Sequence, residues 1–366
     1  MVKGLNKYMI YKSKQWIEDI DIVSNTLPEL SSLDGKSILI TGATGLICSA
    51  IVDILIRYNE THTKKIKIFA AGRWPEKIKN RFGDFCNKEY FEIIKYNALK
   101  TNNIIQVSAD YIIHGASNAY PAMIIKEPVE TMVSNFTGVL SLLEYAKVHG
   151  TRRILYISSS EIYGKKEDGQ PFKEEEYGVI DLLNSRNSYS VAKRASETLC
   201  ISYANEYGVE SVIARPGHIY GPTAFLNDNR VSSAFAYLAA RGENIIMKSA
   251  GMQLRSYCYC LDCASAMFKI LIKGEDSHAY NISNPESIIT IKEMATILAN
   301  TGNVQLIQSI ATEAEKGEFN PMSNSSLESK RLQELGWKGC FNAEKGLEHT
   351  VQILRESQEG YLKSKN

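Results

Sequence analysis

The chain has 366 residues, of which 44% are hydrophobic, and its 42 basic residues are balanced by 41 acidic ones, giving a formal net charge of +1. This length is enough for two lobes around a sizeable core. The balanced charge argues against a broad nucleic-acid-binding or membrane-binding surface.

The cysteines and the first residues fit a reducing compartment. The chain has 7 cysteines, an odd number, and its opening residues include lysines (Lys3, Lys7) in place of an uninterrupted apolar signal segment. We therefore expect a cytoplasmic protein with reduced thiols. Cys258 and Cys260 alternate with tyrosines as on a strand, and without a second Cys/His pair after them we expect no metal. Residues 1–33 form an N-terminal extension to which we assign no chemistry.

The first predicted strand covers residues 37–41 and leads into a glycine-rich turn. Gly42 and Gly45 follow the strand, and apolar residues at helical spacing come next. Such glycines let backbone N–H groups approach a pyrophosphate at a helix N-terminus. The pattern predicts a dinucleotide-binding turn and excludes a membrane span here. Cys48 stands where such turns usually have a third glycine for close helix–strand packing, and we expect it to be tolerated.

The second predicted strand begins at residue 66 and ends at Gly72 and Arg73, without an acidic residue. A carboxylate at this point binds the ribose 2′-hydroxyl of NAD, whereas an arginine accepts the 2′-phosphate of NADP. The choice between NAD and NADP is therefore open.

Two further strands are predicted at residues 91–97 and 110–117. His114 lies beside Ile113 and is interpreted as a hydrogen-bonded core residue. We expect a loop over residues 121–128 and a long helix over residues 131–149.

The strand predicted over residues 152–157 is followed by a run of serines and Glu161. Further on, Tyr189 and Lys193 are four residues apart, which places them on one face of a helix that we expect to reach residue 207. A phenol has an unperturbed pKa of about 10, and a neighbouring ammonium lowers that pKa toward the range of a working acid/base. Serines at the carboxyl edge of a strand lie where open α/β sheets place ligands.

The alternation of strands and helices predicts an α/β fold with a right-handed, doubly wound, mostly parallel Rossmann-type sheet. Beyond Pro222 the pattern shortens into a smaller C-terminal α+β lobe. We therefore expect a dinucleotide-binding domain over residues 34–216, with a returning segment near residues 256–285, and a substrate lobe over residues 217–366.

These motifs resemble the extended short-chain dehydrogenases/reductases, and among them the NAD-dependent epimerase/dehydratase family that modifies nucleotide sugars. The resemblance runs from about residue 36 to residue 350. It rests on the glycine-rich turn, on Ser159-Ser160-Glu161 before Ile-Tyr-Gly, on the Tyr189/Lys193 pair and on the run Arg215-Pro-Gly-His-Ile-Tyr-Gly-Pro222. It implies that NAD or NADP is retained by Gly42, Thr44, Gly45, Leu46, Ile47, Arg73, Asn97, Ala98, Gly115, Ala116, Ser117, Asn135, Tyr189, Lys193 and Pro216.

The resemblance also implies an enzyme that transiently oxidises C4 of a nucleotide-linked sugar. Its catalytic residues would be Tyr189, Lys193, Ser159, Ser160 and Glu161. Its substrate would be bound by Ser160, Glu161, Tyr189, His218, Arg230, Val231 and Arg255. We further expect a homodimer.

Two motifs are closest to UDP-glucuronate decarboxylases: Ser159-Ser160-Glu161, and residues 227–231, which resemble Asp-Gly-Arg-Val. The first motif also fits GDP-mannose dehydratases. Against the decarboxylases, Thr223 stands where they usually have arginine, and His218 replaces their usual asparagine. A 4-epimerase and a 4,6-dehydratase are therefore alternatives. A non-catalytic dinucleotide-binding protein is a more distant one, because such proteins typically lose the Tyr or the Lys.

Overall fold

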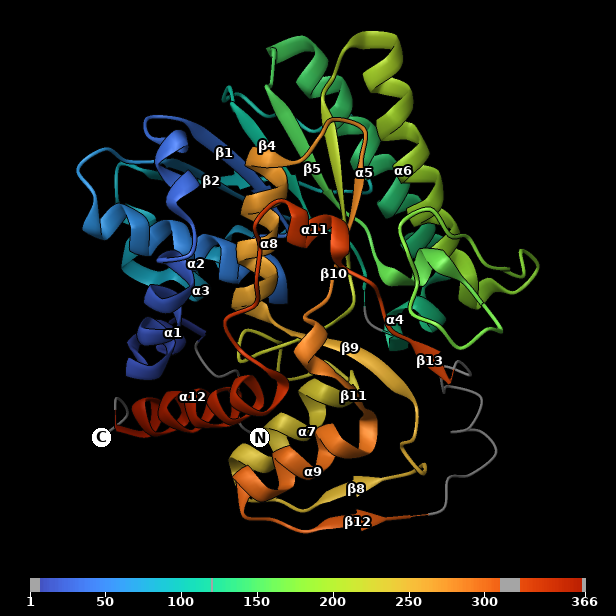
Figure 1. Ribbon diagram of the computed structural model, residues 1–366. Helices are drawn as coiled ribbons and strands as arrows, with labels where there is room; N and C mark the ends of the chain where they lie inside the picture. Colours follow the sequence, from blue (N-terminus) through green and yellow to red (C-terminus); the bar gives the residue numbers. More distant parts are fainter. Residues whose placement is uncertain (1–6, 120, 310–322, 364–366) are drawn as a thin grey trace.

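The computed structural model describes residues 7–119, 121–309 and 323–363 (Figure 1). Its main feature is a seven-stranded sheet with the strand order β10-β6-β5-β4-β1-β2-β3, in which all neighbouring strands are parallel. The sheet therefore winds outward in both directions from β1, as the predicted Rossmann-type fold requires. The strands are β1 (Ser37–Thr41), β2 (Lys67–Gly72), β3 (Phe91–Lys95), β4 (Tyr111–His114), β5 (Arg153–Ile157), β6 (Ser211–Pro216) and β10 (Ala279–Ile282).

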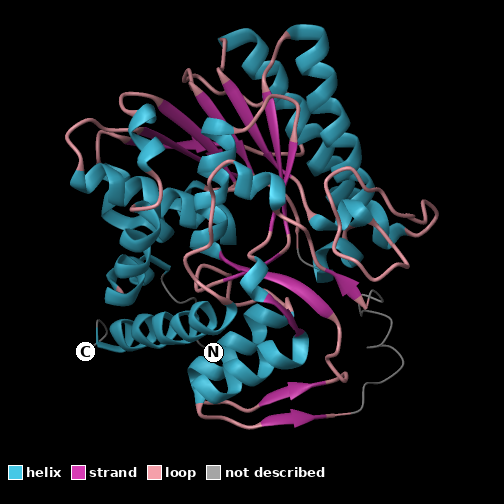
Figure 2. Cartoon of the chain, in the orientation of Figure 1, coloured by secondary structure: helices cyan, strands magenta, loops and turns pink. Residues whose placement is uncertain are grey.

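Helices cover both faces of this sheet (Figure 2). Successive side chains of a strand point to opposite faces, so β1 contributes side chains to two hydrophobic cores. Ile38 and Ile40 pack into one core, and Leu39 packs into the other. The first core takes side chains from α2 (Leu46–Thr61), α3 (Pro75–Phe82) and α8 (Cys260–Lys273). The second takes side chains from α5 (Pro128–His149) and α6 (Ser188–Tyr207).

The smaller lobe is built around β9 (Leu254–Tyr259), which pairs with β7, β11 and β13. A separate parallel pair, β8 with β12, lies at the end of the lobe away from the large sheet (Figure 2). The remaining strands are β7 (His218–Tyr220), β8 (Ile245–Met247), β11 (Ile288–Thr290), β12 (Leu306–Gln308) and β13 (Asn324–Ser325). The helices of the lobe are α7 (Val231–Arg241), α9 (Ile291–Gly302), α11 (Lys330–Glu334) and α12 (Ala343–Lys363).

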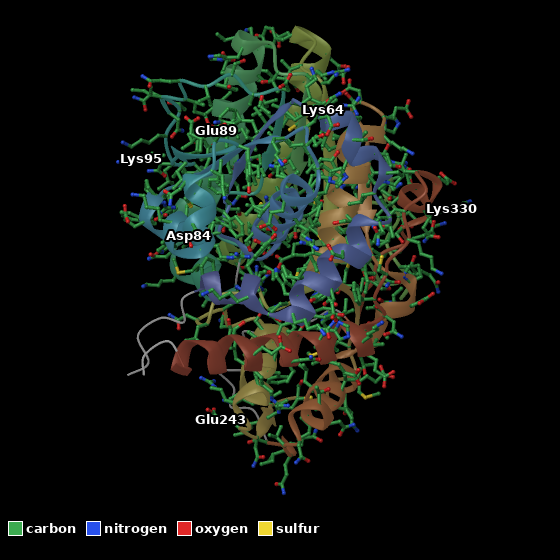
Figure 3. The ribbon with its side chains drawn as sticks, turned by 90° about the vertical axis from the view of Figure 1, so that its left-hand side faces the viewer. Lys64, Asp84, Glu89, Lys95, Glu243 and Lys330 are labelled. Carbon is green, nitrogen blue, oxygen red and sulfur yellow. The ribbon has the colours of Figure 1, made fainter. Side chains whose placement is uncertain are left out.

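The N-terminal extension joins the two lobes. It forms η1 (Lys7–Lys12), α1 (Lys14–Ser24) and η2 (Pro28–Leu33), and Figure 3 shows the first two lying across one side of the molecule, next to α12. The indole Nε1 of Trp16 donates to Asp53 of α2 at 3.0 Å. Asp19 accepts from the Tyr259 hydroxyl at 2.9 Å and lies 2.8 Å from Nδ1 of His349. The extension is therefore part of the folded core, although its residues 1–6 lie outside the described residues.

One prediction about secondary structure was wrong. The segment expected to be a loop at residues 121–128 contains a short helix, α4 (Pro121–Lys126). Proline at its first position is compatible with a helix start, because that residue needs no intrahelical N–H donor. The other short helical turns are η3 (Gly83–Asn87), η4 (Ser160–Tyr163), η5 (Ser185–Asn187) and η6 (Pro285–Ser287). None of the helices in the described ranges is both long and apolar enough to cross a membrane.

Candidate active site

The serines that follow β5 lie at the carboxyl edge of the large sheet. Ser158 is buried and its hydroxyl donates to the carboxylate of Glu197 on α6. Ser159 caps η4, because its hydroxyl accepts the backbone N–H of Glu161 at 3.2 Å. Burial raises the pKa of Tyr189 and the Ser159 hydroxyl opposes that rise, so this hydroxyl lies near the phenol. Ser159 and Tyr189 are therefore neighbours at this edge of the sheet.

Tyr189 and Lys193 lie in the first two turns of α6, and both are buried. The Lys193 ammonium donates to the carbonyl of Ile157 at 2.7 Å and stands 5.6 Å from the centroid of the Tyr189 ring. Burial lowers the pKa of Lys193 to about 7, and burial together with the Glu161 charge raises the pKa of Tyr189 above its usual value. The expected lowering of the Tyr189 pKa by Lys193 is thus wrong for this state, because desolvation raises that pKa and the charges that oppose the rise are those of Arg230 and Arg186.

Glu161 has a partner that the sequence reasoning missed. Its carboxylate accepts from the two terminal nitrogens of Arg186 at 3.3 and 3.5 Å, and from the Ser190 hydroxyl at 3.3 Å. About one third of each charged side chain is exposed, 34% for Glu161 and 32% for Arg186. Arg186 precedes Tyr189 by three positions, and this spacing was the only sequence signal that it faces the same site.

The glycine-rich turn between β1 and α2 is tight. Gly42 has a φ of +70°, and a Cβ there would lie 2.8 Å from the carbonyl oxygen of Gly115 at the end of β4. The N–H of Gly45 donates to the Gly42 carbonyl at 2.8 Å. Gly45 then caps α2 without a side-chain hydrogen bond, so the first N–H groups of the helix, including those of Leu46 and Ile47, have no side-chain cap. Thr44 lies within this turn.

The sulfur of Cys48 lies in the space that a side chain on Gly115 would need. A Cβ added to Gly115 would overlap the sulfur of Cys48 and lie 3.1 Å from Cδ1 of Ile157. The thiol is buried, and burial raises its pKa to about 12. The bulk that Cys48 brings to the helix is therefore accommodated by a glycine that directly follows the facing strand, β4.

The residues after β4 form hydrogen bonds under this turn. His114 is buried and its Nδ1 lies 2.7 Å from the Thr41 hydroxyl, which confirms it as a hydrogen-bonded core residue. The N–H of Ala116 donates to the same hydroxyl at 3.3 Å. The Ser117 hydroxyl donates to the side-chain oxygen of Asn135 at 2.9 Å, which links the end of β4 to α5.

The ends of β2 and β3 have local partners for the residues proposed there. Arg73 pairs with Glu130 of α5 at 3.2 Å. The side-chain oxygen of Asn97 accepts the N–H of Leu99 at 3.2 Å, and Ala98 is buried. Pro216, at the end of β6, is also buried.

The substrate lobe brings further cations toward Tyr189. Arg230 caps α7 just before Val231 and is paired with the buried Asp228, with Nε 2.9 and 3.0 Å from its two oxygens. Arg230 and Arg186 both lower the pKa of Tyr189, which burial raises. Both arginines therefore lie within electrostatic reach of the phenol.

His218 and Arg255 lie on the neighbouring strands β7 and β9. Burial, together with the charges of Arg255 and Arg230, lowers the pKa of His218 to about 3, so this imidazole is neutral at physiological pH. Arg255 is buried and donates to the carbonyl of Leu254 at 2.8 Å. In the described part of the chain, no group of three or more His, Cys, Asp or Glu residues could hold a metal ion.

Comparison with known proteins agrees with this geometry. The model of the NAD dependent epimerase/dehydratase family matches residues 38–283, which include the glycine-rich turn and the Tyr189/Lys193 helix. The chain belongs to this family. It is 31% identical over 332 residues to UDP-glucuronic acid decarboxylase 1 of Xenopus tropicalis, covering 90% of this chain and 75% of the relative.

Two other proteins show the range of related activities. The chain is 29% identical over 328 residues to a trifunctional UDP-glucose 4,6-dehydratase/UDP-4-keto-6-deoxy-D-glucose 3,5-epimerase/UDP-4-keto-L-rhamnose-reductase of Arabidopsis thaliana, covering 88% of this chain and 48% of the relative. The fold is similar to that of a UDP-glucose 4-epimerase from Thermotoga maritima, with a TM-score of 0.74, 22% identity, and coverage of 88% of this chain and 99% of that chain.

The residues around the turn fit NAD, the cofactor of the epimerase/dehydratase family. Gly42 has a positive φ and packs against Gly115 with no side chain between them. The backbone N–H groups of the turn can therefore come close to a pyrophosphate. The uncapped first turn of α2 offers N–H donors and the positive end of the helix dipole to the same group.

Proposed function

We propose that this chain decarboxylates a UDP-linked hexuronic acid through transient oxidation at C4 of the sugar. One arrangement supports the proposal most. Glu161 and Ser159 lie near the buried Tyr189 at the carboxyl edge of the large sheet, beside the glycine-rich turn. Simple 4-epimerases of the resembled family usually lack this glutamate. The relative from Xenopus tropicalis, named a UDP-glucuronic acid decarboxylase, also supports it.

In the proposed reaction, NAD bound at the turn supplies the hydride acceptor and donor. Tyr189 takes the proton of the 4-hydroxyl, and Ser159 and Ser160 orient that oxygen. Lys193 would hold the cofactor ribose. Once C4 is a ketone, the C5–C6 bond can break, because its electron pair is accepted by the adjacent carbonyl. Carbon dioxide leaves, C5 takes up a proton, and reduction at C4 regenerates the alcohol as a UDP-pentose.

The substrate lobe supplies the proposed ligands of the nucleotide sugar. Guanidinium groups suit phosphate oxygens, so Arg230 and Arg255 are proposed as pyrophosphate ligands, with His218 and Val231 lining the same side. Thr223, one of the departures from the decarboxylase pattern, donates to the carbonyl of Leu46 at 2.7 Å and is buried. The threonine that replaces the usual arginine therefore makes a contact between the two lobes.

NAD is the proposed cofactor, and acceptance of NADP rests on Arg73. Its partner Glu130 holds it in an exposed ion pair, with exposed fractions of 39% and 31%. Such pairs are worth about 0–1 kcal/mol, so a 2′-phosphate can compete for the guanidinium.

We propose further that the protein is a cytoplasmic homodimer. All seven cysteines are free thiols, as expected in a reducing compartment. Val129, Met132, Val133 and Phe136 of α5 are exposed at helical spacing, which gives one apolar face for a second copy of the chain. Light scattering after size exclusion, with Val133→Glu as the disrupting variant, tests the dimer.

The reaction is tested by incubating the protein with UDP-glucuronate, UDP-glucose, UDP-N-acetylglucosamine and GDP-mannose and identifying the products by NMR. Carbon dioxide and a UDP-pentose from UDP-glucuronate support the proposal. Inversion at C4 without a change of mass favours a 4-epimerase. Loss of water from UDP-glucose or GDP-mannose favours a 4,6-dehydratase, as in the Arabidopsis thaliana relative.

A further inference from the structure

Arg186 is the cation of the site whose hydrogen bonds are longest. Its two terminal nitrogens meet the two oxygens of Glu161 at 3.3 and 3.5 Å, a parallel arrangement that suits a carboxylate but lies at the weak end of hydrogen-bond distances. Both side chains are about one third exposed, 32% and 34%, so the pair is partly accessible to solvent and to a ligand. An exposed ion pair of this kind contributes little to stability.

The other cations assigned to the site are held more firmly. Arg230 lies against the two oxygens of the buried Asp228. Arg255 is buried and donates to its neighbouring carbonyl at 2.8 Å. Lys193 is buried and donates to Ile157 at 2.7 Å. Replacing the buried partner of Arg230 would uncover a charge, which is costly, so the ligands proposed for Arg230, Arg255 and Lys193 add to the present partners and do not replace them.

Arg186 also lies near the residue that is proposed to contact the 4-hydroxyl of the sugar, Tyr189. It lies in η5, directly before α6, and it acts on Tyr189 through its charge. Glu161 receives a hydrogen bond from Ser190 at the start of α6, and its charge, after burial, raises the pKa of Tyr189, so the carboxylate held by Arg186 lies within electrostatic reach of the phenol. In a hexuronic acid the carboxyl carbon is joined to C4 through C5 alone. When the 4-hydroxyl meets Tyr189, the carboxylate of the substrate is therefore brought to the region that Glu161 occupies.

We propose that Arg186 selects substrates with a carboxylate on C5 of the sugar, which takes the place of the Glu161 carboxylate on the guanidinium. One carboxylate replaces another, so Arg186 keeps its charge partner throughout. The exchange frees Glu161 to contact the sugar ring at the moment the substrate is bound. A neutral hexose has no group to make this exchange and leaves Glu161 on Arg186. This inference rests on the proposed function, because it names what distinguishes the proposed substrate.

Equilibrium binding of UDP-glucuronate, UDP-glucose and UDP tests the proposal by calorimetry. The Tyr189→Phe background, with NAD bound, prevents the ligands from being consumed. Arg186→Gln should weaken UDP-glucuronate by roughly 10- to 100-fold, the loss of a charge-assisted pair, while UDP-glucose and UDP change by less than about threefold. Arg186→Lys should recover part of the loss, because it keeps the charge without the planar fork.

Glu161→Gln is the sharper variant, because it removes the competing carboxylate. It should bind UDP-glucuronate more tightly than the parent does and leave UDP-glucose unchanged. Arg241→Gln, on the exposed end of α7 and paired with Glu243, is the matched control and should affect no ligand.

The proposal is overturned if Arg186→Gln weakens all three ligands alike, if it weakens none, or if Glu161→Gln weakens UDP-glucuronate. It is also overturned if the parent binds UDP-glucuronate no more tightly than UDP-glucose. Failure of the proposed reaction is distinguishable, because it would appear as absence of carbon dioxide in the wild-type product assay while the binding ratios can still be measured.

Discussion

Cys48 and Gly115 are expected to be energetically coupled, because the sulfur of one fills the space that a side chain on the other would need. Gly115→Ala alone forces its new methyl into the thiol, and such overpacking typically costs about 1–3 kcal/mol. The φ of Gly115 is not positive, so the alanine brings no backbone strain. Cys48→Ala alone removes one buried heavy atom and should cost about 1 kcal/mol. The double variant should be nearly as stable as wild type, since the methyl then occupies the vacated volume.

Urea unfolding followed by circular dichroism gives the four free energies of unfolding of this double-mutant cycle, and NAD titration gives the matching affinities. We expect a favourable coupling of about 1–3 kcal/mol and NAD binding that is weakened in Gly115→Ala but restored in the double variant. Cys258→Ala combined with Gly115→Ala is the control, because Cys258 lies on β9 in the other lobe, and its effects should add. Additive effects of Cys48→Ala and Gly115→Ala would refute the packing argument.

Three further predictions concern single side chains. Tyr189→Phe should lower kcat by at least about 100-fold while folding and retained NAD, measured by circular dichroism and by absorbance of released nucleotide, stay as in wild type, because only the proton acceptor is lost; near-normal turnover would remove Tyr189 from catalysis. Arg73→Ala should weaken NADP selectively, and equal effects on NAD and NADP in fluorescence titrations would show that Arg73 binds no 2′-phosphate. The pKa of Lys193 is lowered to about 7 in the folded chain. The pKa of a lysine in the unfolded chain is about 10.4, so the unfolded state holds more protons between these values and the Lys193 contribution to stability becomes more favourable as pH rises through this window. The free energy of unfolding of wild type, minus that of Lys193→Met, should therefore increase between about pH 7 and pH 10. A difference that does not change with pH would contradict the lowered pKa.

The sheet and its helices were predictable because their signals are local. The buried runs before Gly42 and before Ser158 indicated strands, and the Tyr189/Lys193 spacing indicated a helix face. The short helix α4 was missed because a proline at each end of the segment looked like loop chemistry, whereas Pro121 begins the helix. The role of the N-terminal extension was also out of reach, since Asp19 meets its partners on β9 and α12 only after the chain has folded.

In the candidate site, motif residues could be named from the sequence, but their partners could not. Arg186 belongs to no motif that we recognised, and its pairing with Glu161 depends on how η4 and η5 come together. The space for Cys48 depends on Gly115, which is far away in the sequence. The pKa values of Tyr189 and Lys193 depend on burial, which four-residue spacing does not describe.

The most direct test of the proposed reaction is turnover of UDP-glucuronate that carries deuterium at C4, followed by NMR and mass spectrometry. Transient oxidation at C4 with a retained cofactor predicts release of carbon dioxide and a UDP-pentose in which the deuterium is still on C4, even with excess unlabelled NAD in solution. Loss of the deuterium, or an unchanged hexuronate with inverted configuration at C4, would contradict the proposal.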